Sequence, residues 1–115
     1  MALVKIPEQQ RVIEGHEPVR AFLATHDLEP DAIRSWIAHP GGPAVIDGIE
    51  QGLALVPGAL DASRRGLATI GNLSSASVLV LLRDVLNGER PAPGSPGMLF
   101  AMGPGFCAEL VLLEW

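Results

Sequence analysis

The chain has 115 residues, 48% hydrophobic and 18% charged, a composition that predicts one folded domain and excludes a disordered chain as its main state. Its net charge of -5 and the absence of tyrosine leave neither a basic stripe nor a stacking platform for nucleic acid. No apolar run is long enough to span a bilayer, no secretory signal is visible, and the single cysteine permits no internal disulfide. A reducing cytoplasm is the expected compartment.

Hydrophobic periodicity and turn residues predict a mixed α/β chain. The predicted elements are, in chain order, a strand end at 2–6, one kinked helix or two short helices over 8–26, a turn from 30, a buried strand at 33–38, helices at 43–55, 61–70 and 74–86, a surface loop at 89–97, and strands at 98–102 and 106–113 joined by a tight turn at 103–105. Pro18 would kink the first helix, whereas Pro43 suits a first helical position, where its missing N–H would be unpaired anyway. Asp61 is expected to cap its helix and Gly71 to end it. The last two strands are apolar on successive residues, so we expect both of their faces to be covered.

Three corners rich in glycine or amides are candidate sites for chemistry. In the first, His39 follows a buried strand and precedes the Pro-Gly-Gly-Pro sequence of 40–43. The carboxyl end of such a strand is where open α/β sheets place reactive groups. The alternative is a capping or core histidine, in a turn that needs proline and glycine for its shape.

The second and third corners are Gly71-Asn72 and the Gly-Pro-Gly sequence of 103–105. The amide of Asn72 can donate hydrogen bonds without carrying charge, and the alternative is a plain helix N-cap, which asparagine favours. The third corner has the alternative of a simple turn between strands. Neither of the glycine-rich phosphate-binding motifs, GxGxxG and GxxxxGK[ST], occurs in the chain.

The remaining polar candidates favour structural roles. Cys107 has apolar neighbours and no nearby cation or helix N-terminus to lower its pKa, so a packing role is expected. His16 and His26 lie ten residues apart, which is not a ligand spacing, and are expected to be solvated or capping. Asp47 and Glu50 are interpreted as a solvated helix face. No metal site is expected.

The corners are more specific together than singly. The informative runs are WIAHPGGPAVID at 36–47, EQGLAL at 50–55, SR at 63–64, GNLSSASV at 71–78 and GPG at 103–105. In order and spacing these runs resemble the C-terminal half of chalcone synthase-like type III polyketide synthases, over nearly the whole chain. The related ketoacyl synthases of the initiation type usually carry His-Gln-Ala-Asn where this chain has His-Pro-Gly-Gly, which favours the polyketide branch.

The resemblance implies the thiolase fold, in which two similar α/β halves pack around a buried site. Residues 1–115 are then expected to form a single partial domain, the C-terminal half of that fold. Its sheet would be mixed, with about four strands and covering helices, and would lack the strands that open this half. The implied partners are a cysteine-bearing N-terminal half, CoA thioesters and a further copy in a homo-oligomer, most simply a homodimer.

The family's catalytic set is a cysteine, a histidine and an asparagine. By motif, His39 matches the histidine and Asn72 the asparagine. Cys107 does not match the nucleophile, which this family carries in its N-terminal half. The resemblance therefore implies an acyltransferase half-site for the decarboxylative condensation of malonyl-CoA onto an acyl-CoA-derived starter, with no metal or redox cofactor.

Two further expectations accompany that reading. The residues Gly103, Pro104 and Gly105 resemble the family's loop that shapes the cavity floor. The alternative to a half-site is a catalytically inactive truncated or split-gene fragment that acts as an interaction module, or a half that resembles ketoacyl-ACP synthase III. Starter, number of extensions and cyclisation mode are not encoded in these motifs.

Overall fold

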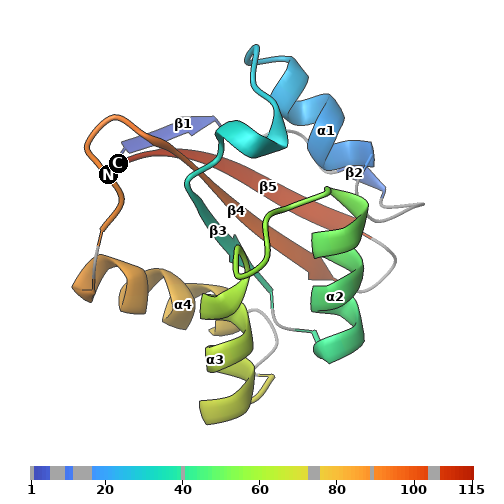
Figure 1. Ribbon diagram of the computed structural model, residues 1–115, viewed down its shortest axis with the longest axis vertical. Helices are drawn as coiled ribbons and strands as arrows, with labels where there is room; N and C mark the ends of the chain where they lie inside the picture. Colours follow the sequence, from blue (N-terminus) through green and yellow to red (C-terminus); the bar gives the residue numbers. More distant parts are fainter. Residues whose placement is uncertain are drawn as a thin grey trace.

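The computed structural model describes residues 2–5, 10–11, 17–39, 41–72, 76–88, 90–103 and 107–115. The elements are, in chain order, β1 (Ala2–Lys5), β2 (Gln10–Arg11), α1 (Glu17–Ala24), the 3-10 helix η1 (Pro30–Ala32), β3 (Ser35–Ala38), α2 (Pro43–Gly52), α3 (Asp61–Thr69), α4 (Ala76–Asn87), β4 (Pro96–Gly103) and β5 (Cys107–Glu114). Figure 1 shows how these elements surround one sheet. The α/β class expected from the sequence is confirmed.

The sheet is mixed, as the sequence predicts. Its strand order is β1-β5-β4-β3, and the two-residue β2 also pairs with β5. The long strands β4 and β5 form an antiparallel hairpin whose register runs from Pro96 opposite Glu114 to Gly103 opposite Cys107. By contrast, β3 lies parallel to β4, with Ala38 opposite Phe100. The two strands that form the predicted site edge therefore end at the same side of the sheet.

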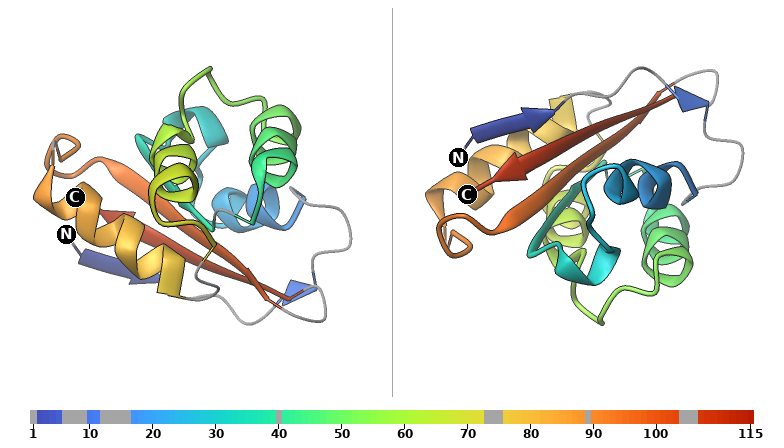
Figure 2. Two further views of the ribbon diagram at one scale, coloured as in Figure 1. Left: turned by 90° about the horizontal axis from the view of Figure 1, so that it is seen from below. Right: turned by 90° about the horizontal axis from the view of Figure 1, so that it is seen from above.

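Helices cover both faces of the sheet, but unequally (Figure 2). Side chains of α1 and α2 pack with alternate residues of the strands in a larger core, whose fully buried members include Leu23, Ile46 and Phe100. On the opposite face, α4 packs Val78 and Leu81 against a smaller cluster. The last two strands thus have helices on both faces, as expected, but the cover on the α4 side is only partial, since Leu99 and Val111 are half-buried there. Among those residues, no helix has the length and apolar character needed to cross a membrane.

Several predicted boundaries are wrong, each for an identifiable reason. Gln10–Arg11 pairs with β5 as a strand, so the helix predicted from residue 8 is not continuous. Pro18 occupies the first turn of α1, where a missing N–H is harmless, and it does not kink a longer helix. Residues 12–16, which include His16, lie outside the described residues. The loop predicted over 89–97 ends early, because Pro96 and Gly97 already belong to β4.

The helix α2 starts at Pro43 as predicted but ends at Gly52, three residues before the predicted end at Leu55. The Asp61 cap is also wrong, since Leu60 is the N-cap residue of α3. Gly71, with a φ of 83°, ends that helix as expected, because a left-handed conformation is cheap only for glycine. The helix predicted from residue 74 is described from Ala76, because residues 73–75 lie outside the described residues.

A hydrogen bond between the end of β5 and the start of β3 ties the sheet together. Trp115 Nε1, just after β5, donates to Ser35 Oγ at 2.7 Å, and Gly97 of β4 pairs with Ser35 on one side and with Leu113 on the other. A Cβ at position 97 would lie 2.5 Å from Ser35 Oγ and 2.6 Å from Trp115 Nε1. Glycine at this position is thus a condition for the contact.

We expect Gly97→Ala to lower the free energy of unfolding by roughly 1–3 kcal/mol, because the added methyl group would displace both partners of this bond. Urea denaturation followed by tryptophan fluorescence measures the loss. Gly48→Ala is the matched control: position 48 lies inside α2 and has nothing within 4 Å of an added Cβ. That control should be neutral or stabilise by up to about 1 kcal/mol. Equal losses in both variants would contradict the steric explanation.

The thinner cover over the second face predicts association of the 115-residue chain. Leu79 of α4 is 66% exposed, and Leu99 and Val111 on this face are only half-buried. Apolar side chains that stay exposed in this way favour self-association.

We expect Leu79→Lys to shift the chain toward the monomer in sedimentation velocity at tens of micromolar. Val56→Lys is the control, since Val56 is 73% exposed but lies in the connection between α2 and α3. A native chain that sediments as a stable monomer would contradict the expectation.

Candidate active site

Two of the predicted corners, those that contain His39 and Gly103, lie at one edge of the sheet. Because β3 and β4 are parallel, His39, which follows β3, and Gly103, which ends β4, both lie at the carboxyl edge. The α3–α4 connection includes residues 73–75, which lie outside the described part of the chain; α4 itself begins near the end of β3, where Val78 and Ile37 belong to one buried cluster (Figure 1). Asn72 belongs to this connection. The arrangement is the one in which open α/β sheets place their ligand sites.

His39 is half-buried, and hydrogen bonds fix its backbone. Its N–H donates to the carbonyl of Phe100 at 2.8 Å, and its own carbonyl accepts the N–H of Gly41 at 2.9 Å. Among the described residues, the buried Nδ1 of its ring has no hydrogen-bond partner. The buried Nε2 of His26 likewise has no hydrogen-bond partner among the described residues.

The other predicted residues are placed less completely. Asn72 is exposed, and it directly follows Gly71 at the end of α3. Gly103 pairs with Cys107 across the hairpin, whereas Pro104 and Gly105 lie outside the described residues. Cys107 begins β5, and the packing role expected for its side chain stays a prediction. The described residues contain no group of histidine, cysteine and acidic side chains that could hold a metal ion.

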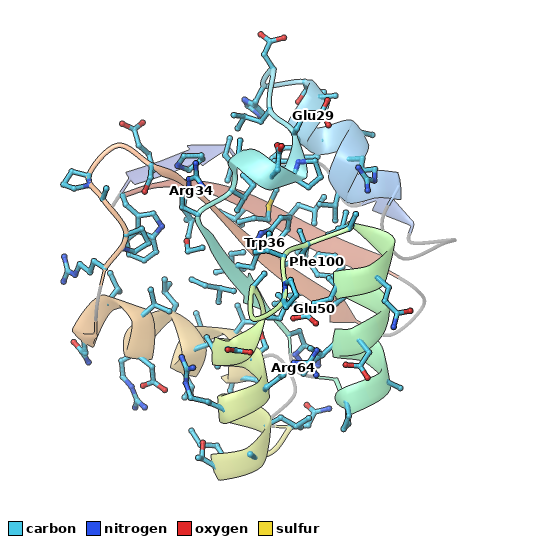
Figure 3. All side chains as sticks on the ribbon, viewed as in Figure 1. Glu29, Arg34, Trp36, Glu50, Arg64 and Phe100 are labelled. Atoms are coloured by element: carbon cyan, nitrogen blue, oxygen red, sulfur yellow. The ribbon has the colours of Figure 1, made fainter. Side chains whose placement is uncertain are left out.

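The interpretation of Asp47 and Glu50 as a solvated face is wrong for Glu50. Arg64 of α3 lies between them, with Nη1 2.8 Å from Asp47 Oδ1 and Nη2 2.7 Å from Glu50 Oε2 (Figure 3 labels Glu50 and Arg64). Hydrogen bonds to Asp47 and then to Glu50 raise the pKa of the Arg64 guanidinium. Glu50 Oε1 also accepts the N–H of Leu60 at 3.3 Å. These four residues form a clamp, called here the α2–α3 clamp.

Sequence reasoning missed this clamp because it depends on which helix faces which. The acidic pair lies three residues apart on α2, a pattern that fits solvent as well as a facing arginine. The adjacent Ser63 was part of a matched run but had no assigned role. It is fully buried, and its Oγ donates to the carbonyl of Ala38 at 2.8 Å.

A separate hollow of about 440 Å³ lies between α3 and α4. Arg65 and Asp84 contribute its charged lining, and neither His39 nor Asn72 lines it. Gly66 and Leu81, which both line the hollow, lie close together across the two helices, since a Cβ on Gly66 would lie 2.5 Å from Leu81 Cδ2. The hollow is distinct from the carboxyl edge that carries the predicted donors.

The family of the chain follows from the comparison with known domains. The model of the chalcone and stilbene synthase C-terminal domain matches residues 31–115. The chain belongs to this family. The match includes every predicted site residue and confirms the resemblance drawn from the motifs, including the preference for the polyketide branch.

Members of the chalcone and stilbene synthase family resemble the chain in sequence and in fold. The chain is 57% identical, over 96% of its length, to the 1,3,6,8-tetrahydroxynaphthalene synthase of Streptomyces peucetius subsp. caesius, and it covers 29% of that protein. The solved tetrahydroxynaphthalene synthase of Streptomyces coelicolor A3(2), a bacterial type III polyketide synthase, matches with 32% identity and a TM-score of 0.80, over 85% of this chain and 28% of that one. PKS-I from the brown alga Ectocarpus siliculosus matches with 34% identity and a TM-score of 0.72, over 84% and 27%. The chain thus spans less than a third of the length of these relatives.

We expect Glu50→Ala to lower the free energy of unfolding by roughly 1–2 kcal/mol, because the partly buried N–H of Leu60 loses a charged acceptor. Asp47→Ala should cost less than about 0.5 kcal/mol, because the Asp47 side chain is 54% exposed. Urea denaturation at low salt and at roughly 1 M salt separates the contributions of Glu50 and Asp47, since salt screens exposed ion pairs most. Equal and equally salt-sensitive losses would show that Glu50 behaves as a surface residue.

Proposed function

We propose that the chain supplies His39 and Asn72 to the active site of a type III polyketide synthase that condenses malonyl-CoA onto an acyl starter. The observation that carries the proposal is that His39 and Gly103 lie together at the carboxyl edge of parallel strands, while Asn72 is assigned by its motif. Family membership supplies the reaction class. Residues 1–115 would then act as one partial domain, and a cysteine-bearing part would supply the nucleophile.

The proposed chemistry explains the two residue types. A cysteine thiolate takes an acyl group from a CoA thioester, and a neighbouring imidazolium stabilises that thiolate. Loss of CO2 from malonyl-CoA leaves an enolate with negative charge on its thioester oxygen, which needs aimed donors. An N–H of the His39 ring and the amide NH2 of Asn72 would provide them. Acyl-CoA and malonyl-CoA are substrates, and this chemistry calls for no metal or redox cofactor.

The rest of the proposed assembly follows from the same chemistry. The Gly103 end of β4 would lead into the loop that shapes the cavity floor. A homodimer would cover apolar surface that the described helices leave exposed. A reducing cytoplasm would keep the cysteine available as a thiol.

The second candidate is an inactive interaction module. It is favoured by the exposed apolar surface of α4, which would serve association without any chemistry. A chimera discriminates the two: this chain replaces the matched segment of the 57% identical Streptomyces peucetius synthase. We expect the folded chimera to release CO2 from malonyl-CoA and to lose this activity in His39→Ala. A folded chimera without activity would support the interaction module.

Within the chimera, we expect Asn72→Asp to slow malonyl-CoA decarboxylation by about 10²–10³-fold, because a carboxylate would repel the enolate instead of donating to it. Loading of the starter should change much less, since the first acyl transfer depends mainly on the cysteine and His39. Stopped assays with labelled starter and labelled malonyl-CoA measure the two steps separately. Arg83→Ala is the control, because Arg83 is exposed and pairs only with Asp84 among the described residues. Decarboxylation at the unmutated rate in Asn72→Asp would overturn the role given to Asn72.

A further inference from the structure

The peptide unit that joins Ala38 to His39 is held at both of its polar ends. Its carbonyl, on Ala38, accepts a hydrogen bond from Ser63 Oγ at 2.8 Å. Its N–H, on His39, donates to the carbonyl of Phe100 at 2.8 Å. A peptide unit is planar, so two hydrogen bonds from different elements fix the orientation of the whole plane. Together with the rotation about the N–Cα bond of His39, that plane sets the direction in which its side chain leaves the backbone.

A serine is unusual at the position of Ser63, because the side chain there is buried. It is fully buried, beside Ala38 at the end of β3. A buried hydroxyl is costly unless it is hydrogen-bonded, and the bond to Ala38 satisfies it. Alanine would fill most of the same space without a polar group. The serine is therefore explained by the carbonyl that it fixes, at the end of the strand that leads into His39.

The α2–α3 clamp holds Ser63 in register with that carbonyl. Arg64, the next residue, reaches across to Asp47 and Glu50, and Glu50 also accepts the N–H of Leu60 at the start of α3. The first turn of α3 is consequently fixed to α2, which itself follows the His39 turn. The hydroxyl of Ser63 is thus carried on a turn that cannot shift along the strand without breaking charged contacts.

We propose that Ser63 is a positioning residue for His39: it orients the imidazole through the Ala38–His39 peptide. This inference rests on the function proposed for His39. A donor that acts on a developing charge must be held to within about half an ångström of its working geometry. A misplacement of about 1 Å can cost on the order of 10²-fold in rate.

The test compares four variants in the chimera and in the isolated chain. Ser63→Ala removes the hydroxyl, and Ser63→Thr retains it. Ser95→Ala is the matched control, because Ser95 Oγ also donates to a backbone carbonyl, that of Ala92 at 2.6 Å, in an exposed turn. Ile49→Val removes one buried methyl group and controls for a loss of stability that leaves the peptide untouched.

In the chimera, Ser63→Ala should lower kcat for malonyl-CoA decarboxylation by roughly 10–100-fold, while KM changes by less than about twofold. Ser63→Thr should recover most of that loss, and Ser95→Ala and Ile49→Val should stay within about twofold of the parent. In the labelled chain, carbonyl ¹³C and amide ¹⁵N resonances of Ala38 and His39 should shift in Ser63→Ala and return in Ser63→Thr. This second readout needs no activity, so it remains informative if the alanine chimera fails to fold.

Two results would overturn the inference. One is an alanine variant that retains kcat although His39→Ala abolishes it. The other is an alanine variant whose loss is matched by Ile49→Val at equal stability, since that would show a general packing effect. If His39→Ala itself leaves decarboxylation unchanged, the function proposed for His39 fails, and the resonance shifts alone then report whether Ser63 orients the peptide.

Discussion

The parallel pairing of β3 with β4 is the constraint on which the site depends. It places the ends of two strands that are far apart in sequence at one edge of the sheet, with Ala38 opposite Phe100. An antiparallel arrangement of the same strands would send His39 and the glycine end of β4 to opposite edges. Parallel pairing needs a crossover, and α2, α3 and α4 together form it. Helices of this crossover pack on both faces of the sheet, α2 on one face and α4 on the other.

The sequence predicted most elements because their signals are local. Pro43 marks a helix start, Gly71 marks a helix end, and the two apolar runs that flank the glycine-proline turn form the hairpin β4–β5. Local signals fail where pairing with a distant element decides the secondary structure. Gln10–Arg11 becomes a strand because β5 has an open edge there, and periodicity over the neighbouring residues cannot report that edge.

The same division applies to the candidate site. His39 and Asn72 could be proposed from their motifs, and the common edge of His39 and Gly103 follows from the strand topology. The α2–α3 clamp could not be predicted, because an acidic pair on a helix and an arginine on the next helix carry no sign that they face each other. The role proposed for Ser63 could not be predicted either, because it depends on one carbonyl at the end of another element. Contacts between side chains or carbonyls of different elements cannot be read from the local sequence of either element.

The topology also has a consequence for how the chain reaches its fold. The hairpin β4–β5 closes over the three residues 104–106, whereas pairing of β3 with β4 must close the whole segment 39–95. Loop closure over that distance costs more entropy and is slow compared with hairpin formation. During synthesis, β3 and the three crossover helices leave the ribosome before β4 exists to pair with them. Their apolar faces would stay exposed until β4 and β5 have been synthesised. This stage of synthesis is therefore when a chaperone would be most useful.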